Sequence, residues 1–218
     1  MPKVRIDRKI LIANEEYANN NREFLSRRKM PCLNVISSPG SGKTTILAKT
    51  IESLKGKIRI GVVEGDIQTD IDAQRIRTTG APAVQINTDG ACHLSAAQVS
   101  SAFHKLPVDK LDLIIIENVG NLVCPSVFDL GETAKIAVLS VPEGDDKPEK
   151  YPAIFTRAAA VLINKIDLLG LTDFDIEKAK ADILKLNKET NIFPISAKNG
   201  QGLQQWCDWL LKLTGKTK

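Results

Sequence analysis

The chain has 218 residues, 43% of them hydrophobic, and a formal net charge of +4. This length can bury one substantial core, so we expect a single domain over residues 1–218. The small basic excess is spread along the sequence, which argues against a nucleic-acid partner. No apolar run approaches the length of a bilayer span, and the N-terminus lacks the apolar core of a signal peptide. We therefore expect a soluble, cytoplasmic protein with no membrane partner.

The cysteines are too few and too scattered for a disulfide framework in a chain of this length, so reduced thiols are expected. Cys207 falls between two tryptophans in a closing amphipathic segment, where packing in the core is the simplest interpretation. The same interpretation is favoured for Cys32. Any chemical role would then belong to Cys92 and Cys124.

The expected elements alternate between helices and strands. The first is a helix within residues 7–30, where apolar residues fall close to helical spacing, and we interpret residues 1–30 as a helical extension packed on the domain. Apolar runs follow at residues 32–37, 58–65, 82–86, 111–120, 135–141, 159–165 and 191–196. Helical patterns lie between or after them at residues 44–55, 96–106, 175–189 and 202–213. Strands that are apolar on both faces and alternate with helices predict an α/β fold with a mostly parallel sheet and helices on both faces.

The segment "SSPGSGKTT" at residues 37–45 is typical of the phosphate-binding loop of a P-loop NTPase. Its glycines let backbone N–H groups face phosphates, Lys43 can reach the β and γ oxygens, and the Thr44 hydroxyl can bind magnesium. The pattern G-x-x-x-x-G-K-S/T requires glycine where this chain has Ser37, which questions the local turn geometry. A chance turn before a helix is the alternative. The residues expected to bind the phosphates are Gly40, Ser41, Gly42, Lys43, Thr44 and Thr45.

The segment "LINKID" places Asn164, Lys165 and Asp167 at the end of an apolar run. Asp167 can accept hydrogen bonds from the N1–H and the amino group of guanine, which adenine cannot supply, so GTP or GDP is expected rather than an adenine nucleotide. Asn164 suits the opposite edge of the base, and the stem of Lys165 can cover the ring. The "SAK" segment, Ser196, Ala197 and Lys198, would bring a backbone N–H toward the guanine oxygen. Alone, the Asn-Lys-x-Asp motif could also cap a helix. Its occurrence after a phosphate loop, with both motifs at the ends of apolar runs, makes the nucleotide interpretation more specific.

Acidic residues follow two further strands. Asp66 lies just past the second apolar run, with Asp70 and Asp72 on an expected switch segment beyond it. Glu117 and Gly120 form E-x-x-G where many GTPases have D-x-x-G, and the Gly120 amide can bond the γ-phosphate. A helix cap or a solvated charge is the alternative for each acid, most of all for Asp70.

From these positions we expect a magnesium site and a catalytic group that share residues. The magnesium ligands are expected to be Thr44, Asp66 and Glu117, and the catalytic group Lys43, Asp66, Asp72 and Glu117. The role of Asp72 in hydrolysis is inferred from its position alone. Asn121 and Leu122 follow Gly120, where a glutamine would orient the attacking water, so hydrolysis is expected to be slow without a partner or dimerisation.

The motifs "SPGSGKT", "EGD", "NTDGACHL", "ENVGNLVCP", "FDLGE", "PEGDDKPEKYP" and "NKIDLL" occur together over nearly the whole chain. In this combination the sequence resembles the HypB family, the nickel-incorporation GTPases of hydrogenase maturation in the SIMIBI class of P-loop proteins. The related urease accessory GTPase UreG carries its metal ligands as Cys-Pro-His, which "VCPSVF" does not match.

The resemblance implies a GTP-dependent homodimer with a nickel or zinc site at the subunit interface, held by Cys92, His93 and Cys124. Thiolate and imidazole groups suit both metals, so the metal is left open. The fourth position would go to water or to the partner. His104 is expected at the surface. Packing of both cysteines in the core remains the alternative to a metal role.

The resemblance also implies other hydrogenase maturation proteins and the large subunit of nickel–iron hydrogenase as partners. In the segment at residues 142–152, expected to be a loop, Lys147 or Lys150 can approach a phosphate of the opposing subunit or simply be solvated. The N-terminus carries neither the Cys-rich nickel motif nor the His-rich tract of some members, so nickel storage is not expected.

The expected function is therefore a GTP-hydrolysing metallochaperone that helps to insert nickel into nickel–iron hydrogenase, with GTP or GDP and Mg²⁺ as cofactors. One alternative is a metal-binding chaperone in which GTP is only a structural ligand. Another is a GTPase that serves a different nickel or cobalamin metalloenzyme, such as urease.

Overall fold

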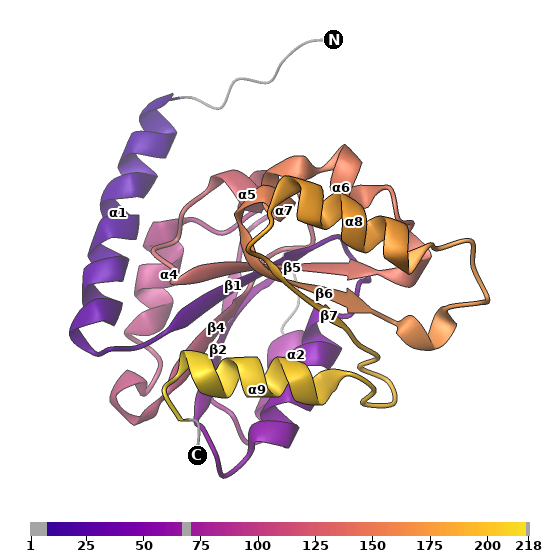
Figure 1. Ribbon diagram of the computed structural model, residues 1–218. Helices are drawn as coiled ribbons and strands as arrows, with labels where there is room; N and C mark the ends of the chain where they lie inside the picture. The colour runs from indigo at the N-terminus through magenta and orange to yellow at the C-terminus, as the bar shows by residue number, and fades with distance from the viewer. Residues whose placement is uncertain (1–7, 67–70, 217–218) are drawn as a thin grey trace.

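The computed structural model describes residues 8–66 and 71–216 and contains a parallel sheet (Figure 1). Its order is β3-β2-β4-β1-β5-β6-β7, and each neighbouring pair of strands is parallel. The carboxyl ends of parallel strands meet at one edge of a sheet, which is where loops build ligand sites. The strands are β1 (Cys32–Ser37), β2 (Ile60–Asp66), β3 (Ala83–Asn87), β4 (Leu113–Glu117), β5 (Ala134–Ser140), β6 (Ala158–Asn164) and β7 (Asn191–Pro194).

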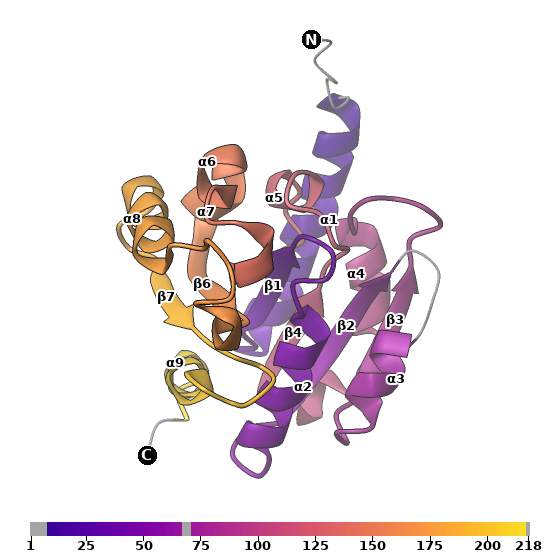
Figure 2. The same cartoon turned by 90° about the vertical axis from the view of Figure 1, so that its right-hand side faces the viewer.

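Helices cover both faces of this sheet (Figure 2). The α-helices are α1 (Arg8–Arg27), α2 (Lys43–Leu54), α3 (Ile71–Arg77), α4 (Ala96–Phe103), α5 (Cys124–Val127), α6 (Lys147–Lys150), α7 (Pro152–Arg157), α8 (Ile176–Leu186) and α9 (Leu203–Leu213). Three short 3-10 helices are η1 (Val108–Lys110), η2 (Val141–Glu143) and η3 (Ile166–Leu168). Apolar residues of α2, α3 and α9 join one face of the sheet, while α1 and α4 cover half of the other face and α7 and α8 cover the rest.

Alternation along the central strands divides the core between the two faces. Leu33 and Val35 of β1 belong to the cluster under α2 and α9, whereas Cys32 packs with α1 and α4 and Ile36 with α7. The same strand is therefore buried on both sides, as its continuous apolar sequence predicted. Cys32 and Cys207 are both buried in the core, as expected.

The N-terminal helix α1 packs on α4, and its first turns extend beyond the body in Figure 1. The rings of Phe24 and Phe103 stack with centroids 5.8 Å apart, and Leu25 is buried. The buried amide of Asn21 adds polar contacts, because it donates to the carbonyl oxygens of Ala96 and Leu130, each at 2.9 Å. The division into one domain with residues 1–30 as an extension stays a prediction.

The segment at residues 142–152 differs from the expected loop. It forms the end of η2 and all of α6, and α7 begins at Pro152. Prolines explain the difference, because Pro142, Pro148 and Pro152 each occupy a first-turn position where a missing N–H is tolerated. Among the described residues, no helix is long and apolar enough to cross a membrane.

Candidate nucleotide and metal site

The phosphate loop connects β1 to α2, and its two glycines adopt the backbone conformation that the turn requires. Gly40 has φ 75° and Gly42 has φ 96°, both in the left-handed region. A Cβ at Gly42 would also lie 2.6 Å from Nδ2 of Asn164. A side chain at position 42 would therefore be strained and would clash with Asn164, and Gly42 and Thr45 at the start of α2 line a pocket where an anion could meet the helix N-terminus.

Ser37 takes the consensus glycine position without strain. Ser37 does not have a positive φ, so the turn does not need glycine at this position. Its hydroxyl accepts a hydrogen bond from Nζ of the buried Lys43 at 3.0 Å and lies 2.5 Å from the Ser41 hydroxyl. The serine thus holds the lysine side chain within the loop.

The acids expected to bind magnesium lie beside this loop. The Thr44 hydroxyl donates a 2.9 Å hydrogen bond to Oε1 of Glu117, and both residues are buried. Asp66 ends β2, and Asp72 lies in the first turn of α3. Asp70 lies outside the described residues.

Glu64 is a second buried acid at this site, and it was missed in the sequence. It pairs in register with Glu117 across β2 and β4. Burial, followed by the charge of Glu117, raises the pKa of the Glu64 carboxyl well above its usual range. A carboxylic acid inside an otherwise apolar strand was the sequence signal that could have identified it, because such a residue is rarely buried without a partner.

The donor set around these acids fits a hard divalent cation. Among the described residues, Oε1 of Glu64 and Oε2 of Glu117 are buried without a hydrogen-bond partner. Oxygen atoms of carboxylates and hydroxyls are the ligands that Mg²⁺ prefers. Thr44, Asp66 and Glu117 would therefore hold the ion, which would supply positive charge to the phosphates and would favour the charged form of Glu64 that burial disfavours.

The motifs predicted to bind the base line a pocket next to the phosphate loop. It has a volume of about 480 Å³. The Ser196 hydroxyl donates to Oδ1 of Asp167 at 2.6 Å, which orients the carboxylate. Arg75 of α3 also lines the pocket, and its helical position gave no sequence signal for this. The pocket is lined by Gly42, Thr45, Lys49, Arg75, Asn164, Lys165, Asp167, Leu168, Ala197 and Lys198.

Asn164 joins the two halves of this pocket. Its Nδ2 donates to the carbonyl oxygen of Ser41 at 2.8 Å, and its Oδ1 accepts from the N–H of Ala197 at 3.1 Å. Lys165, in the left-handed conformation, donates from Nζ to the carbonyl oxygen of Gly40 at 2.7 Å. Both side chains therefore connect the base loops to the phosphate loop, and direct contacts with the base stay predictions.

Cys92, His93 and Cys124 come together from two loops. Cys92 and His93 lie in the Cys92 loop (residues 88–95) after β3, and Cys124 opens α5 in the Cys124 loop (residues 119–133) after β4. The two sulfur atoms are 3.0 Å apart, and Sγ of Cys92 is 3.6 Å from Nδ1 of His93. All three ligand atoms lie within 4.8 Å of one another. This is a donor set of two thiols and one imidazole, which suits a borderline or soft divalent metal.

The surroundings of the cluster favour a neutral imidazole. The His93 ring stacks on Phe128, with centroids 3.8 Å apart, and burial lowers the pKa of His93. Burial, followed by the Cys92 thiol, raises the pKa of Cys124. A bound metal would favour the thiolate and release the proton. His104, by contrast, is exposed, as expected.

Gly120 brings the Cys124 loop into contact with the phosphate loop. A Cβ at this position would lie 2.9 Å from Cα and 3.0 Å from the nitrogen of Pro39. Asn121, next along the loop, donates from Nδ2 to the carbonyl oxygen of Cys92 at 3.4 Å. The segment after Glu117 thus contacts both the phosphate loop and the thiol cluster.

Lys147 and Lys150 are engaged within their own segment. Nζ of Lys147 lies 5.4 Å from the centre of the Tyr151 ring, and Lys150 forms an ion pair with Asp146. A contact of either lysine with a partner's phosphate stays a prediction.

The parallel sheet and the phosphate loop define a P-loop nucleotide-binding protein, and the thiol cluster adds a candidate metal site on two neighbouring loops. Residues 31–194 match the CobW/HypB/UreG nucleotide-binding domain. The chain belongs to this family and, within it, to the HypB hydrogenase maturation factors, as the motifs predicted.

Three relatives illustrate the similarity. The Escherichia coli hydrogenase maturation factor HypB is 50% identical over 96% of this chain and 72% of that protein. The Helicobacter pylori hydrogenase/urease maturation factor HypB is 44% identical over 96% of this chain and 87% of that protein. A crystal structure of HypB from Helicobacter pylori in complex with nickel superposes with a TM-score of 0.89 at 43% identity, covering 94% of this chain and 96% of that one.

Proposed function

We propose that this chain is a GTP-hydrolysing metallochaperone that helps to insert nickel into nickel–iron hydrogenase. The observation that carries the proposal is the convergence of Cys92, His93 and Cys124, with ligand atoms within 4.8 Å, on the loops that follow β3 and β4. The relative from Escherichia coli is named a hydrogenase maturation factor, and the one from Helicobacter pylori was crystallised with nickel.

GTP and Mg²⁺ would bind first at the phosphate loop and the acids. The γ-phosphate would hold Gly120, and with it the Cys124 loop, through contacts that GDP cannot make. Metal would then be bound at the interface of a homodimer, and hydrolysis would loosen the cluster so that the metal passes to an acceptor, which we expect to be a hydrogenase maturation protein or the hydrogenase large subunit.

The test is nickel and zinc affinity, measured by competition with a chromophoric chelator, with GDP and with a non-hydrolysable GTP analogue. The wild type is compared with Cys124→Ala, and Cys207→Ala is the matched control because it removes a thiol from the core. We expect an affinity that depends on nucleotide and is lost only in Cys124→Ala. Metal affinity that is equal in all three proteins would reject the proposal.

Nucleotide preference is tested separately with Asp167→Asn. Exchange of the carboxylate for an amide keeps one acceptor, for the guanine N1–H, but replaces the acceptor for the guanine amino group with an N–H donor, at a cost of about 1–3 kcal/mol. We expect GDP affinity to fall by about 5- to 150-fold and xanthosine diphosphate to bind better than to the wild type. Unchanged GDP affinity would contradict the assigned base contact.

A second candidate function is the service of urease, because the relative from Helicobacter pylori is named a hydrogenase/urease maturation factor. Binding of the purified chain to urease accessory proteins rather than to hydrogenase maturation proteins would favour it. A chaperone with GTP as a structural ligand would instead transfer metal fully with the non-hydrolysable analogue.

A further inference from the structure

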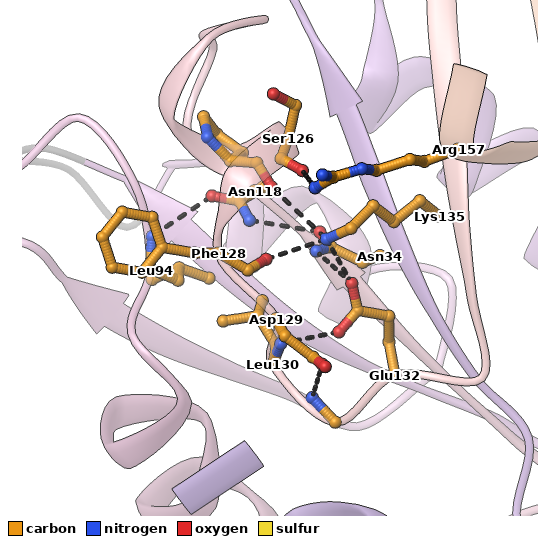
Figure 3. A network of polar contacts seen from close by, with 12 residues as sticks. Asn34, Leu94, Asn118, Ser126, Phe128, Asp129, Leu130, Glu132, Lys135 and Arg157 are labelled. Atoms are coloured by element: carbon orange, nitrogen blue, oxygen red, sulfur yellow. Dashed lines mark hydrogen bonds and ion pairs between the residues drawn. The ribbon is translucent and has the colours of Figure 1, made fainter. Parts of the chain in front are cut away.

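A buried polar network connects β1, β4 and β5 to the two loops that carry the thiol cluster (Figure 3). Asn34 of β1 and Asn118, just after β4, are 0% and 1% exposed. The side chains of Glu132 and Lys135 are 4% and 12% exposed. None of these residues belongs to the nucleotide or metal ligands assigned above.

Asn118 holds the Cys92 loop at one end of the network. Its Oδ1 accepts a 3.2 Å hydrogen bond from the N–H of Leu94, the residue after His93, and a 3.0 Å bond from the N–H of Val119. Its Nδ2 donates to Oδ1 of Asn34 at 3.1 Å. One side chain therefore fixes the backbone beside a predicted metal ligand and connects it to β1.

Glu132 and Lys135 hold the Cys124 loop at the other end. Asn34 donates from Nδ2 to Oε1 of Glu132 at 3.2 Å, and the other carboxylate oxygen accepts from the N–H of Leu130 at 2.7 Å. Lys135 pairs with Glu132 at 2.5 Å and donates to the carbonyl oxygen of Phe128 at 2.8 Å. Phe128 carries the ring on which His93 stacks.

This network has a definite geometry because its buried donors and acceptors have few other hydrogen-bond partners. A buried charge or amide that loses its partner is strongly destabilised, so the donors and acceptors keep one arrangement. The Lys135 ammonium also approaches the carbonyl oxygen of Pro125 at 3.4 Å, within α5. A shift at the end of β4 would thus move both metal loops together rather than either one alone.

The bound nucleotide could cause such a shift at the end of β4, because Asn118 is adjacent to a predicted magnesium ligand. Asn118 follows Glu117, whose carboxylate is predicted to bind Mg²⁺ and accepts a hydrogen bond from Thr44. We propose that Asn118 and Lys135 are positioning residues that set the separation of the Cys92 and Cys124 loops and so couple metal affinity to the bound nucleotide. The inference rests on the proposed function and adds the residues that transmit the coupling.

The experiment uses the full chain with nickel as the probe. Nickel affinity is measured by chelator competition with GDP and with the non-hydrolysable analogue, and the affinity for each nucleotide is measured alongside. The variants are Asn118→Ala and Lys135→Met, with Lys135→Arg as the conservative exchange that keeps a cation. The control is Asn187→Ala, which removes an asparagine bond to the carbonyl oxygen of Ala158 on the far half of the sheet.

The ratio of the two nickel affinities is the decisive quantity, because a merely structural role would lower both affinities equally. We expect the wild-type ratio, about 5- to 150-fold for typical allosteric coupling, to fall toward one in Asn118→Ala and in Lys135→Met. Lys135→Arg and the control should keep it. Asn118→Asp, which keeps the acceptor for Leu94 but loses the donor to Asn34, replaces Asn118→Ala if that protein does not fold.

Two failures can be told apart. A wild-type ratio above one that persists in Asn118→Ala and Lys135→Met, while Cys124→Ala abolishes binding, overturns the inference and leaves the proposed function in place. Nickel affinity that is unaffected by Cys124→Ala overturns the proposed function and the inference with it.

Discussion

Glu117 and Asn118 are neighbours at the end of β4, and their side chains contact opposite sides of the sheet. Glu117 accepts a hydrogen bond from Thr44 of α2, whereas Asn118 accepts one from Leu94, beside the predicted metal ligand His93. Successive side chains of a strand point to opposite faces, so this arrangement follows from the position of the pair at the strand end. A single peptide unit therefore joins the two candidate sites.

Replacement of Gly120 by alanine should weaken nucleotide binding. The new Cβ would lie 2.9 Å from Cα of Pro39, and because backbone must move to relieve the contact, the phosphate loop or the Cys124 loop would shift. We expect GDP and GTP-analogue affinities to fall about tenfold, about 1.4 kcal/mol. Gly170→Ala is the control: its φ of 85° strains the exchange, unlike at Gly120, but nothing lies within 4 Å of the new Cβ. Equal affinities in both variants would contradict the steric argument.

Replacement of Glu64 by glutamine should stabilise the protein in the absence of divalent cations. Two buried carboxyl groups paired across β2 and β4 repel each other unless one holds a proton or a cation lies between them. We expect a higher urea midpoint without Mg²⁺ and a smaller gain on addition of Mg²⁺ with GDP. Glu52→Gln, an exposed exchange on α2, is the control. A lower midpoint without Mg²⁺ would show that Glu64 contributes net stability.

Thr50 and Trp206 form a buried hydrogen bond between α2 and α9. Nε1 of Trp206 donates to the Thr50 hydroxyl at 3.0 Å, and both residues are 0% exposed. Thr50→Val keeps the shape but leaves the indole N–H unpaired, so we expect the free energy of unfolding to fall by about 1–3 kcal/mol. Urea denaturation followed by tryptophan fluorescence measures it. Thr50→Ser, which keeps the hydroxyl, should lose less; an equal loss would assign the effect to packing.

Asp112 should contribute a small stability that depends on pH. The hydrogen bond from the Arg59 guanidinium lowers the pKa of Asp112 from 3.8 to about 2. Because the folded pKa lies below the unfolded one, the stabilisation is complete above about pH 4 and is lost as the pH falls through about 2. The Arg59 side chain is 62% exposed, so solvent limits the contribution to below about 1 kcal/mol.

Asp112→Asn tests this pair by urea denaturation at several pH values. The difference in unfolding free energy from the wild type should be largest at pH 7 and should shrink between about pH 4 and pH 2. Asp109→Asn is the control, because Asp109 is 83% exposed in its pair with Arg28. A difference that grows on acidification would contradict the sign of the pKa shift.

The sequence by itself determined most of the fold and the order of the motifs. Strands buried on both faces read as continuous apolar runs, and each predicted run overlaps a strand of the sheet. The phosphate loop could be predicted as well, because its glycines set the turn and its lysine and threonine supply the polar groups for phosphate and magnesium. These requirements concern adjacent residues, so they appear in the sequence. Helix α6 was missed because its four residues are too few for a periodic signal.

Only the tertiary structure decided which side chains from neighbouring strands and loops come into contact. The pairing of Glu64 with Glu117 follows from the strand order. The distance between Cys92 and Cys124 depends on two loops that α4, η1 and β4 separate in the chain. Likewise, Asn34, Asn118, Glu132 and Lys135 look like ordinary polar residues until β1, β4 and β5 are placed side by side. Contacts at long sequence separation are set by how the whole sheet packs, and no local pattern encodes them.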